Sequence, residues 1–212
     1  MKYFVKTPWL LKKVYPTFTW HIPTKEKILY LTFDDGPHET ATPFVLDELK
    51  KYNAKATFFC IGKNVVNHPA IYRRICEEGH AVGNHTYNHL NGWKTDDTAY
   101  INDIIKAAEV IDSRLFRPPY GRIKKFQARI LQRDNNAAHR LFSIIMWDVL
   151  SGDFDVDLSP QKCLSNVIDN ADDGSVIVFH DSTKAWSRMS YALPKVLAHF
   201  SEKGYSFKAL KG

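Results

Sequence analysis

Two histidines in the segment 85–89 are four residues apart. One helical turn or a tight loop can point both imidazole rings at the same position. Two imidazoles and one carboxylate form a common open site for a divalent ion, and Asp35 can supply the carboxylate. A histidine pair alone is more often two ordinary polar side chains, but the neighbouring aspartates favour a ligand set. The pattern therefore predicts a metal site formed by Asp35, His85 and His89.

The adjacent carboxylates of Asp34 and Asp35 can perform different tasks because neighbouring side chains in a turn point in different directions. Two anions side by side repel each other, and a bound cation relieves that repulsion. A free carboxylate next to an activated water molecule can act as a general base. Although Asp-Gly-Pro is also ordinary turn chemistry, we expect Asp34 to be the base.

Four further residues, placed after predicted strands, suggest the rest of a catalytic site. His180 ends the apolar run 175–179 and is a candidate general acid for a leaving amine. Asp153 can hydrogen-bond to this histidine and keep it protonated. Arg117 is a candidate partner for the base, and the backbone N–H of Tyr120 can donate to an oxyanion.

These side chains need a frame that brings several chain segments together, and alternating strand and helix patterns provide one. Strands are predicted at residues 27–33, 56–61, 80–84, 115–117, 141–149, 175–179 and 205–210. Helices are predicted at residues 42–52, 64–78, 126–136 and 191–203. Two more are predicted from their caps: one begins after Thr95, and the other runs from Pro160 to about Asp172 after Ser159.

This alternation indicates an α/β fold with right-handed crossovers and a mainly parallel sheet. Seven units in one small domain favour a distorted (β/α) barrel with about seven parallel strands, and an open doubly wound sheet is the alternative. In both folds the polar residues after the strands meet at one rim, where sites are built.

Taken in order, five segments resemble the five motifs of the polysaccharide deacetylases, also called carbohydrate esterase family 4 or the NodB-homology domain. They are TFDDGP at 32–37, HTYNH at 85–89, RPPYG at 117–121, the segment 147–154, and VFHDS at 178–182. The resemblance implies a distorted (β/α) barrel that removes N-acetyl groups from an amino-sugar polymer or oligosaccharide of chitin or peptidoglycan type. It also implies one divalent ion, with zinc as the first expectation and cobalt or another divalent ion as alternatives.

The resemblance assigns a role to each matching residue. The implied catalytic residues are Asp34 as base, His180 as acid, Arg117 orienting the base and Asp153 tuning the acid. The implied metal ligands are Asp35, His85 and His89, and the implied substrate-binding residues are Pro118, Tyr120, Trp147 and Val178. Leu150 and Phe154 depart from the family pattern, which usually has aspartate and tryptophan there. These departures concern the substrate groove more than the chemistry.

Other functions stay open from the residues alone. Related sites cleave O-acetyl esters or cyclic amides, and a non-catalytic carbohydrate-binding protein could use the same fold. Trp93, Trp186 and Tyr87 could stack on sugar rings or pack in the core. A net charge of +6 admits anionic partners, but the basic runs are short and no fingerprint of a nucleic-acid-binding fold is present.

The length of 212 residues fits one domain. We expect residues 27–212 to form the catalytic domain and residues 1–26, which contain three prolines, to form an extended arm packed on the barrel. Three cysteines without a CxxC pair indicate no disulfide framework, and their flanks indicate burial. No signal-peptide or membrane-span pattern is found, so the sequence fixes no location: the cytoplasm is the default expectation and action at the cell envelope is the alternative. We also expect a monomer.

Overall fold

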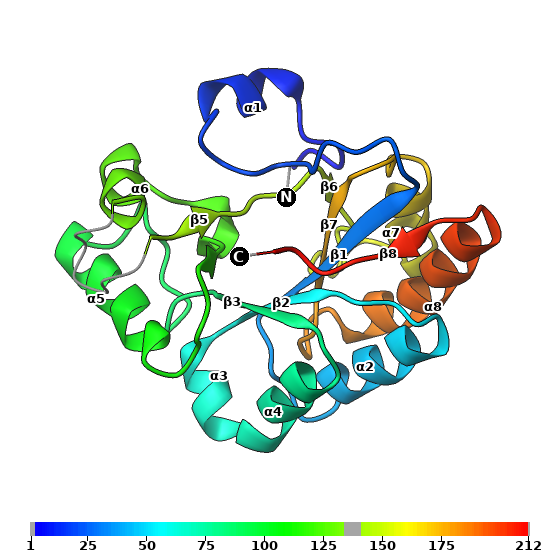
Figure 1. Cartoon of the computed structure of the whole chain (residues 1–212), viewed down its shortest axis with the longest axis horizontal. Helices are drawn as coiled ribbons and strands as arrows, with labels where there is room; N and C mark the ends of the chain where they lie inside the picture. The colour runs from blue at the N-terminus through cyan, green and yellow to red at the C-terminus, as the bar shows by residue number, and fades with distance from the viewer. Residues whose placement is uncertain (1–2, 134–140, 212) are drawn as a thin grey trace.

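The computed structural model describes residues 3–133 and 141–211. Within these residues, eight strands form one sheet in the order β5-β4-β3-β2-β1-β7-β6, with β8 paired to β1. The strands are β1 (Ile28–Asp34), β2 (Thr57–Cys60), β3 (Ala81–Asn84), β4 (Leu115–Phe116), β5 (Ser143–Ile144), β6 (Val149–Leu150), β7 (Val176–His180) and β8 (Ser206–Phe207). Every strand pair is parallel. The sheet curls into an incomplete barrel (Figure 1), which confirms the predicted fold class rather than an open doubly wound sheet.

Helices surround the curled sheet (Figure 1). They are α1 (Trp9–Val14), α2 (Ala41–Lys51), α3 (Gly62–Asn67), α4 (Pro69–Glu77), α5 (Asp97–Ala108), α6 (Lys125–Leu131), α7 (Pro160–Ile168) and α8 (Trp186–Glu202), with a short 3-10 turn η1 (Pro119–Gly121). The described helices contain none that is long and apolar enough to cross a lipid bilayer.

Strand β1 lies in the middle of the sheet and separates the core from the barrel interior. Leu29, Leu31 and Phe33 are fully buried in the main apolar core, which the sheet shares with α2 and α8. Because side chains alternate along a strand, Thr32 and Asp34 face the opposite side. This alternation brings Asp34 to the rim of the barrel at the carboxyl end of β1.

The predicted helix over 64–78 is two helices, α3 and α4, which meet at His68. Pro69 lacks a backbone N–H, and its ring disfavours the α conformation in the preceding residue. His68 accordingly has φ −128° and ψ 56°. The prediction of a single helix is therefore wrong at this point.

The predicted strand over 141–149 is also divided, into β5 and β6. Between them, the carbonyl oxygen of Ile145 accepts a hydrogen bond from Arg117 Nε at 3.3 Å, and that of Met146 accepts one from Arg117 Nη2 at 2.8 Å. These carbonyl groups accept hydrogen bonds from a buried guanidinium instead of from a neighbouring strand. The strand pairing is therefore interrupted here, although the apolar sequence pattern continues through residues 141–149.

Smaller differences concern helix ends and one cysteine. The cap of α5 is Asp96, not Thr95, because the Asp96 side chain accepts hydrogen bonds from two N–H groups of the first turn. Helix α8 begins at Trp186, five residues before the predicted start, and α7 ends at Ile168, before Asp172. Helix α6 ends at Leu131, and residues 134–136 of its predicted range lie outside the described residues. Cys60 and Cys163 are buried as expected, whereas Cys76 is exposed.

The segment before β1 runs along the interval between β5 and β6, where no strand pairing is recorded among the described residues. Its isolated backbone bridges are Lys6 with Val149, Thr19 with Ile145, and His21 with Ser175. Helix α1 interrupts a segment that we expected to be extended, and Pro8 stands at its N-cap. We propose that residues 1–26 act as an arm that closes this interval against residues 27–212.

Candidate active site

The ends of β1 and β7 place Asp34 and His180 side by side. These strands pair in parallel register, with Asp34 opposite His180, and the N–H of Asp181 donates to the carbonyl of Asp34 at 3.1 Å. On the other side of β1, beyond β2, strands β3 and β4 lead to the segments 85–89 and 117–121. The predicted site residues therefore meet at one rim.

Arg117 lies fully buried behind Asp34. Its Nη1 donates to Asp34 Oδ1 at 2.7 Å and to Thr32 Oγ1 at 2.7 Å. The guanidinium also lies over the Phe59 ring at 4.1 Å and donates to the two carbonyl groups between β5 and β6. A charge buried this deeply requires such full pairing. The geometry fixes one carboxylate oxygen of Asp34, which is 4% exposed, and leaves the other for chemistry.

Asp35, His85 and His89 converge on one point. The Nε2 atoms of His85 and His89 lie 3.7 and 3.2 Å from Asp35 Oδ1, and one ligand atom of each residue lies within 4.8 Å of the others. The Nδ1 of His85 is 2.7 Å from the Arg117 carbonyl oxygen. A carbonyl oxygen can only accept, so Nδ1 carries the proton and the Nε2 lone pair faces Asp35.

The charge state of these groups fits a divalent cation. Burial lowers the pKa of His85 to about 4, which leaves its ring neutral at physiological pH. Burial raises the pKa of Asp35, but the close contact with His89 and the charges of His180, His85 and His89 outweigh burial and lower the pKa below its ordinary value. Asp35 Oδ1 is a buried oxygen without a hydrogen-bond partner. One anionic oxygen and imidazole lone pairs are suitable donors for zinc or a similar ion.

His180 is paired with Asp153. Its backbone N–H donates to Asp153 Oδ2 at 2.7 Å, and its Nδ1 lies 2.7 Å from Asp153 Oδ1, which leaves Nε2 for the site. Burial alone would lower the pKa of His180. The negative charge of buried Asp153, its hydrogen bond to the ring and the charges of Asp35 and Asp34 outweigh burial and raise this pKa to about 10. The imidazole is therefore protonated at neutral pH, as a general acid requires.

The buried carboxyl of Asp181 supports the turn that carries the two aspartates, and sequence reasoning assigned it no role. It accepts hydrogen bonds from the Gly36 N–H at 3.1 Å and from the Thr42 hydroxyl. A Cβ at position 36 would lie 2.1 Å from Asp181 Oδ2, so glycine is required for this close approach. Burial raises the pKa of Asp181 to about 8. The signal available was its place directly after the candidate acid.

A second missed residue, Asp103 on α5, fixes the segment that carries both histidines. Its Oδ2 accepts from the N–H groups of Tyr87 and Asn88, each at 2.9 Å, and its Oδ1 accepts from the Asn88 side chain at 2.5 Å. The detectable signal was a single carboxylate within the apolar face of a helix, between Ile101 and Ile104.

Backbone strain is concentrated at this rim. Asp35, Thr86, His89 and Tyr120 have positive φ angles of 82°, 64°, 58° and 59°. Such angles are uncommon for residues other than glycine and occur often at functional sites. Among the described non-glycine residues, Asn53 is the one other residue with a positive φ angle, and it lies outside the predicted site. The loops therefore hold Asp35, His89 and the residue after His85 in conformations that relaxed chains seldom adopt.

The four predicted substrate-binding residues lie around these groups. The exposed Tyr120 ring contacts His89 with 4.6 Å between ring centroids. Trp147 lies against the same loop, because a Cβ on Gly121 would lie 2.6 Å from its ring. Val178 is buried on β7, on the face that also carries His180, by strand alternation. Pro118 is buried next to Arg117.

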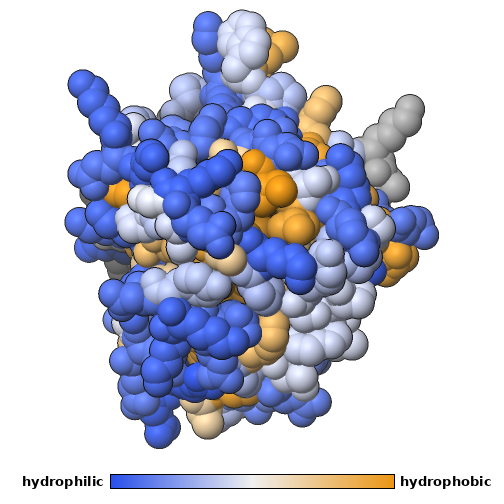
Figure 2. All heavy atoms as spheres, turned by 90° about the vertical axis from the view of Figure 1, so that its right-hand side faces the viewer, coloured by the Kyte–Doolittle hydropathy of each residue, from blue (hydrophilic) through white to orange (hydrophobic). Residues whose placement is uncertain are grey.

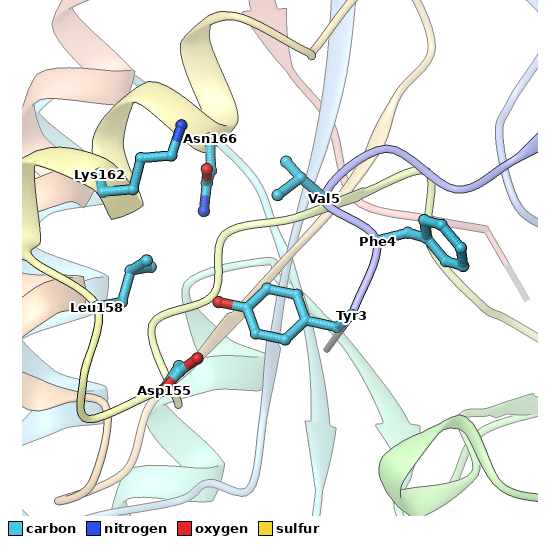
Figure 3. A pocket seen from close by; sticks show the side chains of 7 residues that line it. All are labelled: Tyr3, Phe4, Val5, Asp155, Leu158, Lys162 and Asn166. Carbon is cyan, nitrogen blue, oxygen red and sulfur yellow. The ribbon is translucent and has the colours of Figure 1, made fainter. Parts of the chain in front are cut away.

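Phe154, which departs from the family pattern, connects the acid to the N-terminal segment. Its ring contacts His180 at 5.4 Å and Tyr3 at 5.2 Å between centroids. Beyond Tyr3 lies a cavity of about 510 Å³ between the N-terminal segment and α7 (Figure 3). It is lined by Tyr3, Phe4, Val5, Asp155, Leu158, Lys162 and Asn166, a set that contains none of the predicted site residues. Leu150, the other departure, is buried on β6.

The three aromatic residues considered for sugar stacking have different surroundings. Trp93 is 52% exposed, and the Arg122 guanidinium lies over its ring at 4.1 Å. Tyr87 is half-buried beneath the Lys106 ammonium group at 4.0 Å. Trp186 packs edge-on against Phe44. Trp93 alone of the three is exposed, and Trp186 belongs to the packing of α8.

Comparisons with known proteins identify the family to which the sequence and fold are similar. A family model described as polysaccharide deacetylase matches residues 21–141. The chain is 35% identical to a peptidoglycan-N-acetylglucosamine deacetylase of Bacillus cereus over 93% of this chain and 94% of the relative. It is 35% identical to a chitooligosaccharide deacetylase of Azorhizobium caulinodans over 76% of each chain.

The fold is also similar to that of a solved relative. The crystal structure of the peptidoglycan N-acetylglucosamine deacetylase Bc1960, in complex with 4-naphthalen-1-yl-N-oxidanyl-benzamide, superposes with a TM-score of 0.84. The sequence identity is 35%, and the superposition covers 96% of this chain and 95% of the relative. Since both the family model and a relative of nearly equal length match, the chain belongs to the polysaccharide deacetylase family.

Proposed function

We propose that the chain is a metal-dependent hydrolase that removes N-acetyl groups from amino-sugar units of peptidoglycan or chitin oligosaccharides and releases acetate. The observation that carries the proposal is the cluster of Asp35, His85 and His89, with Asp34 on Arg117 and His180 on Asp153 at the same rim. The names of the relatives in Bacillus cereus and Azorhizobium caulinodans support the substrate class.

Asp35, His85 and His89 would hold the divalent ion, with zinc as our first expectation. When bound, the ion supplies Lewis-acid activation of the acetyl carbonyl and of a water molecule.

The protein groups then divide the proton transfers. Asp34 takes a proton from the attacking water while Arg117 holds its other oxygen. The N–H of Tyr120 donates to the oxyanion of the tetrahedral intermediate. His180 gives its proton to the nitrogen as the carbon–nitrogen bond breaks, which yields acetate and a free amino sugar. We propose that Trp147 and Val178 enclose the acetyl methyl group and that Pro118 shapes this pocket.

The substitution Asp153→Asn is expected to move the alkaline side of the pH–activity profile to lower pH. Asp153 raises the pKa of His180 to about 10, so the acid stays protonated until the pH rises through that value. Without the Asp153 charge, burial is opposed only by the smaller contributions of Asp34 and Asp35, so the pKa of His180 falls and the proton is lost at lower pH. The check is kcat against pH for both proteins. An unchanged alkaline limb would contradict the role of His180 as the acid.

Acetate release from a substrate panel tests the proposed reaction. We expect release from N-acetylglucosamine oligomers or from peptidoglycan, and not from O-acetylated xylan. Release from the xylan alone would replace the proposal with an esterase.

A further inference from the structure

Helix α1 presents its apolar side chains to solvent. Trp9, Leu10, Leu11 and Val14 are 65%, 61%, 39% and 49% exposed, and Phe4 before the helix is 68% exposed. No residue of α1 is buried. The helix projects from the body at the top of Figure 1, and apolar side chains appear on the same projection in Figure 2. We refer to the four exposed apolar side chains of the helix itself as the α1 patch.

The polar side of this segment is the one attached to the protein. Lys12 Nζ lies 2.5 Å from Asp148 Oδ1, and Lys6 Nζ lies 2.7 Å from Asp148 Oδ2. The N–H of Thr7 donates to the Asp148 carbonyl at 2.8 Å. Asp148 is fully buried and also accepts from the Ser175 hydroxyl. An ordinary surface helix buries its apolar face and exposes its charges, so α1 has the opposite arrangement.

Ion pairs therefore fix an apolar surface in an outward orientation, and exposed patches of this kind mark binding surfaces. Their composition indicates the partner. Lys13 Nζ lies 4.5 Å from the Trp9 ring centroid, which puts a cation beside the largest apolar side chain. Tryptophan, leucine and lysine on one short helix are typical of segments that lie in the headgroup region of a bilayer. The net charge of +6 is complementary to an anionic surface.

We propose that the α1 patch binds the surface of an anionic lipid bilayer, with its apolar side chains inserted at the headgroup level and Lys13 beside the lipid charges. The patch is too small for a stable dimer. Four partly exposed side chains offer on the order of 400 Å², below the roughly 800 Å² per partner of a stable interface. The proposal is independent of the proposed catalytic function.

Co-sedimentation of the full chain with vesicles tests this proposal. The vesicles contain equimolar phosphatidylcholine and phosphatidylglycerol, and a second set contains phosphatidylcholine alone. We expect binding to the anionic vesicles and weaker binding to the neutral ones. The triple variant Trp9→Ser, Leu10→Ser, Leu11→Ser should bind the anionic vesicles about tenfold or more weakly, because the lost apolar area no longer enters the bilayer.

Val156 and Phe126 provide a matched control, since they are 62% and 58% exposed but lie outside α1. The variant Val156→Ser, Phe126→Ser should bind like the wild type, and both variants should keep the wild-type thermal midpoint. Equal binding by the triple variant would overturn the proposal and assign binding to general positive charge. Absence of wild-type binding to the anionic vesicles would also overturn the proposal. If the wild type formed a dimer and the triple variant did not, the α1 patch would instead be a contact between two copies of this chain.

Discussion

The substitution Asp34→Asn is expected to reduce deacetylation by about 10²–10⁴-fold, the range that a positioned general base contributes. An amide cannot accept the proton of the attacking water, although its oxygen can still accept the hydrogen bond that Arg117 donates at 2.7 Å. The metal content should stay at the wild-type value because Asp35, His85 and His89 form the ligand cluster without Asp34. The measurements are kcat on an N-acetylglucosamine oligomer and metal analysis of the purified variant.

Loss of the Asp34 charge also leaves the buried Arg117 without its ion pair, which can cost about 3–5 kcal/mol of stability. Activity must therefore be compared well below the thermal midpoint of the variant. Asp157→Asn is a suitable control because it removes the same charge at an exposed position. Turnover of Asp34→Asn within a few-fold of the wild type, with the protein folded, would show that another group is the base.

The substitution His89→Ala is expected to remove both bound metal and activity, in contrast to Asp34→Asn. His89 Nε2 lies 3.2 Å from Asp35 Oδ1, and its loss leaves one imidazole and one carboxylate. Removal of an outer partner of a metal ligand costs 10–100-fold in affinity, so loss of a ligand should cost about 100-fold or more. The measurement is a zinc titration of the chelated protein, monitored by calorimetry, together with the turnover rate at each zinc concentration.

His89 is only half-buried, so the fold should tolerate this substitution. His68→Ala, at the junction of α3 and α4, is the matched control and should leave both zinc affinity and turnover unchanged. If His89→Ala bound zinc as tightly as the wild type, the cluster of Asp35, His85 and His89 would not be the metal site.

The main features of the fold could be predicted because their signals are local. Apolar runs that alternate with amphipathic segments predicted the parallel sheet. The ends of the predicted strands placed Asp34 and His180 at the same edge, where they lie opposite each other. The division of the strand 141–149 could not be read from the sequence. Its cause is the guanidinium of Arg117, more than 25 residues away, which takes the carbonyl groups of Ile145 and Met146.

The same distinction applies to the site. The predicted residues lie together at the rim, and their chemical roles stay predictions that the substitutions above test. Asp181 and Asp103 escaped the sequence reasoning because each acts on backbone N–H groups of another loop, which a residue pattern does not reveal. The outward apolar face of α1 was also hidden, since Asp148 and Lys12 are 136 residues apart.

Metal-dependent N-deacetylation is tested most directly by acetate release from N-acetylglucosamine oligomers and from peptidoglycan, before and after metal removal. We expect no release by chelated protein and recovered release after zinc or cobalt is added back. Release that persists in protein shown to be metal-free would contradict the metal-dependent chemistry. Absence of release from both substrates, with metal bound, would contradict the proposed N-deacetylation.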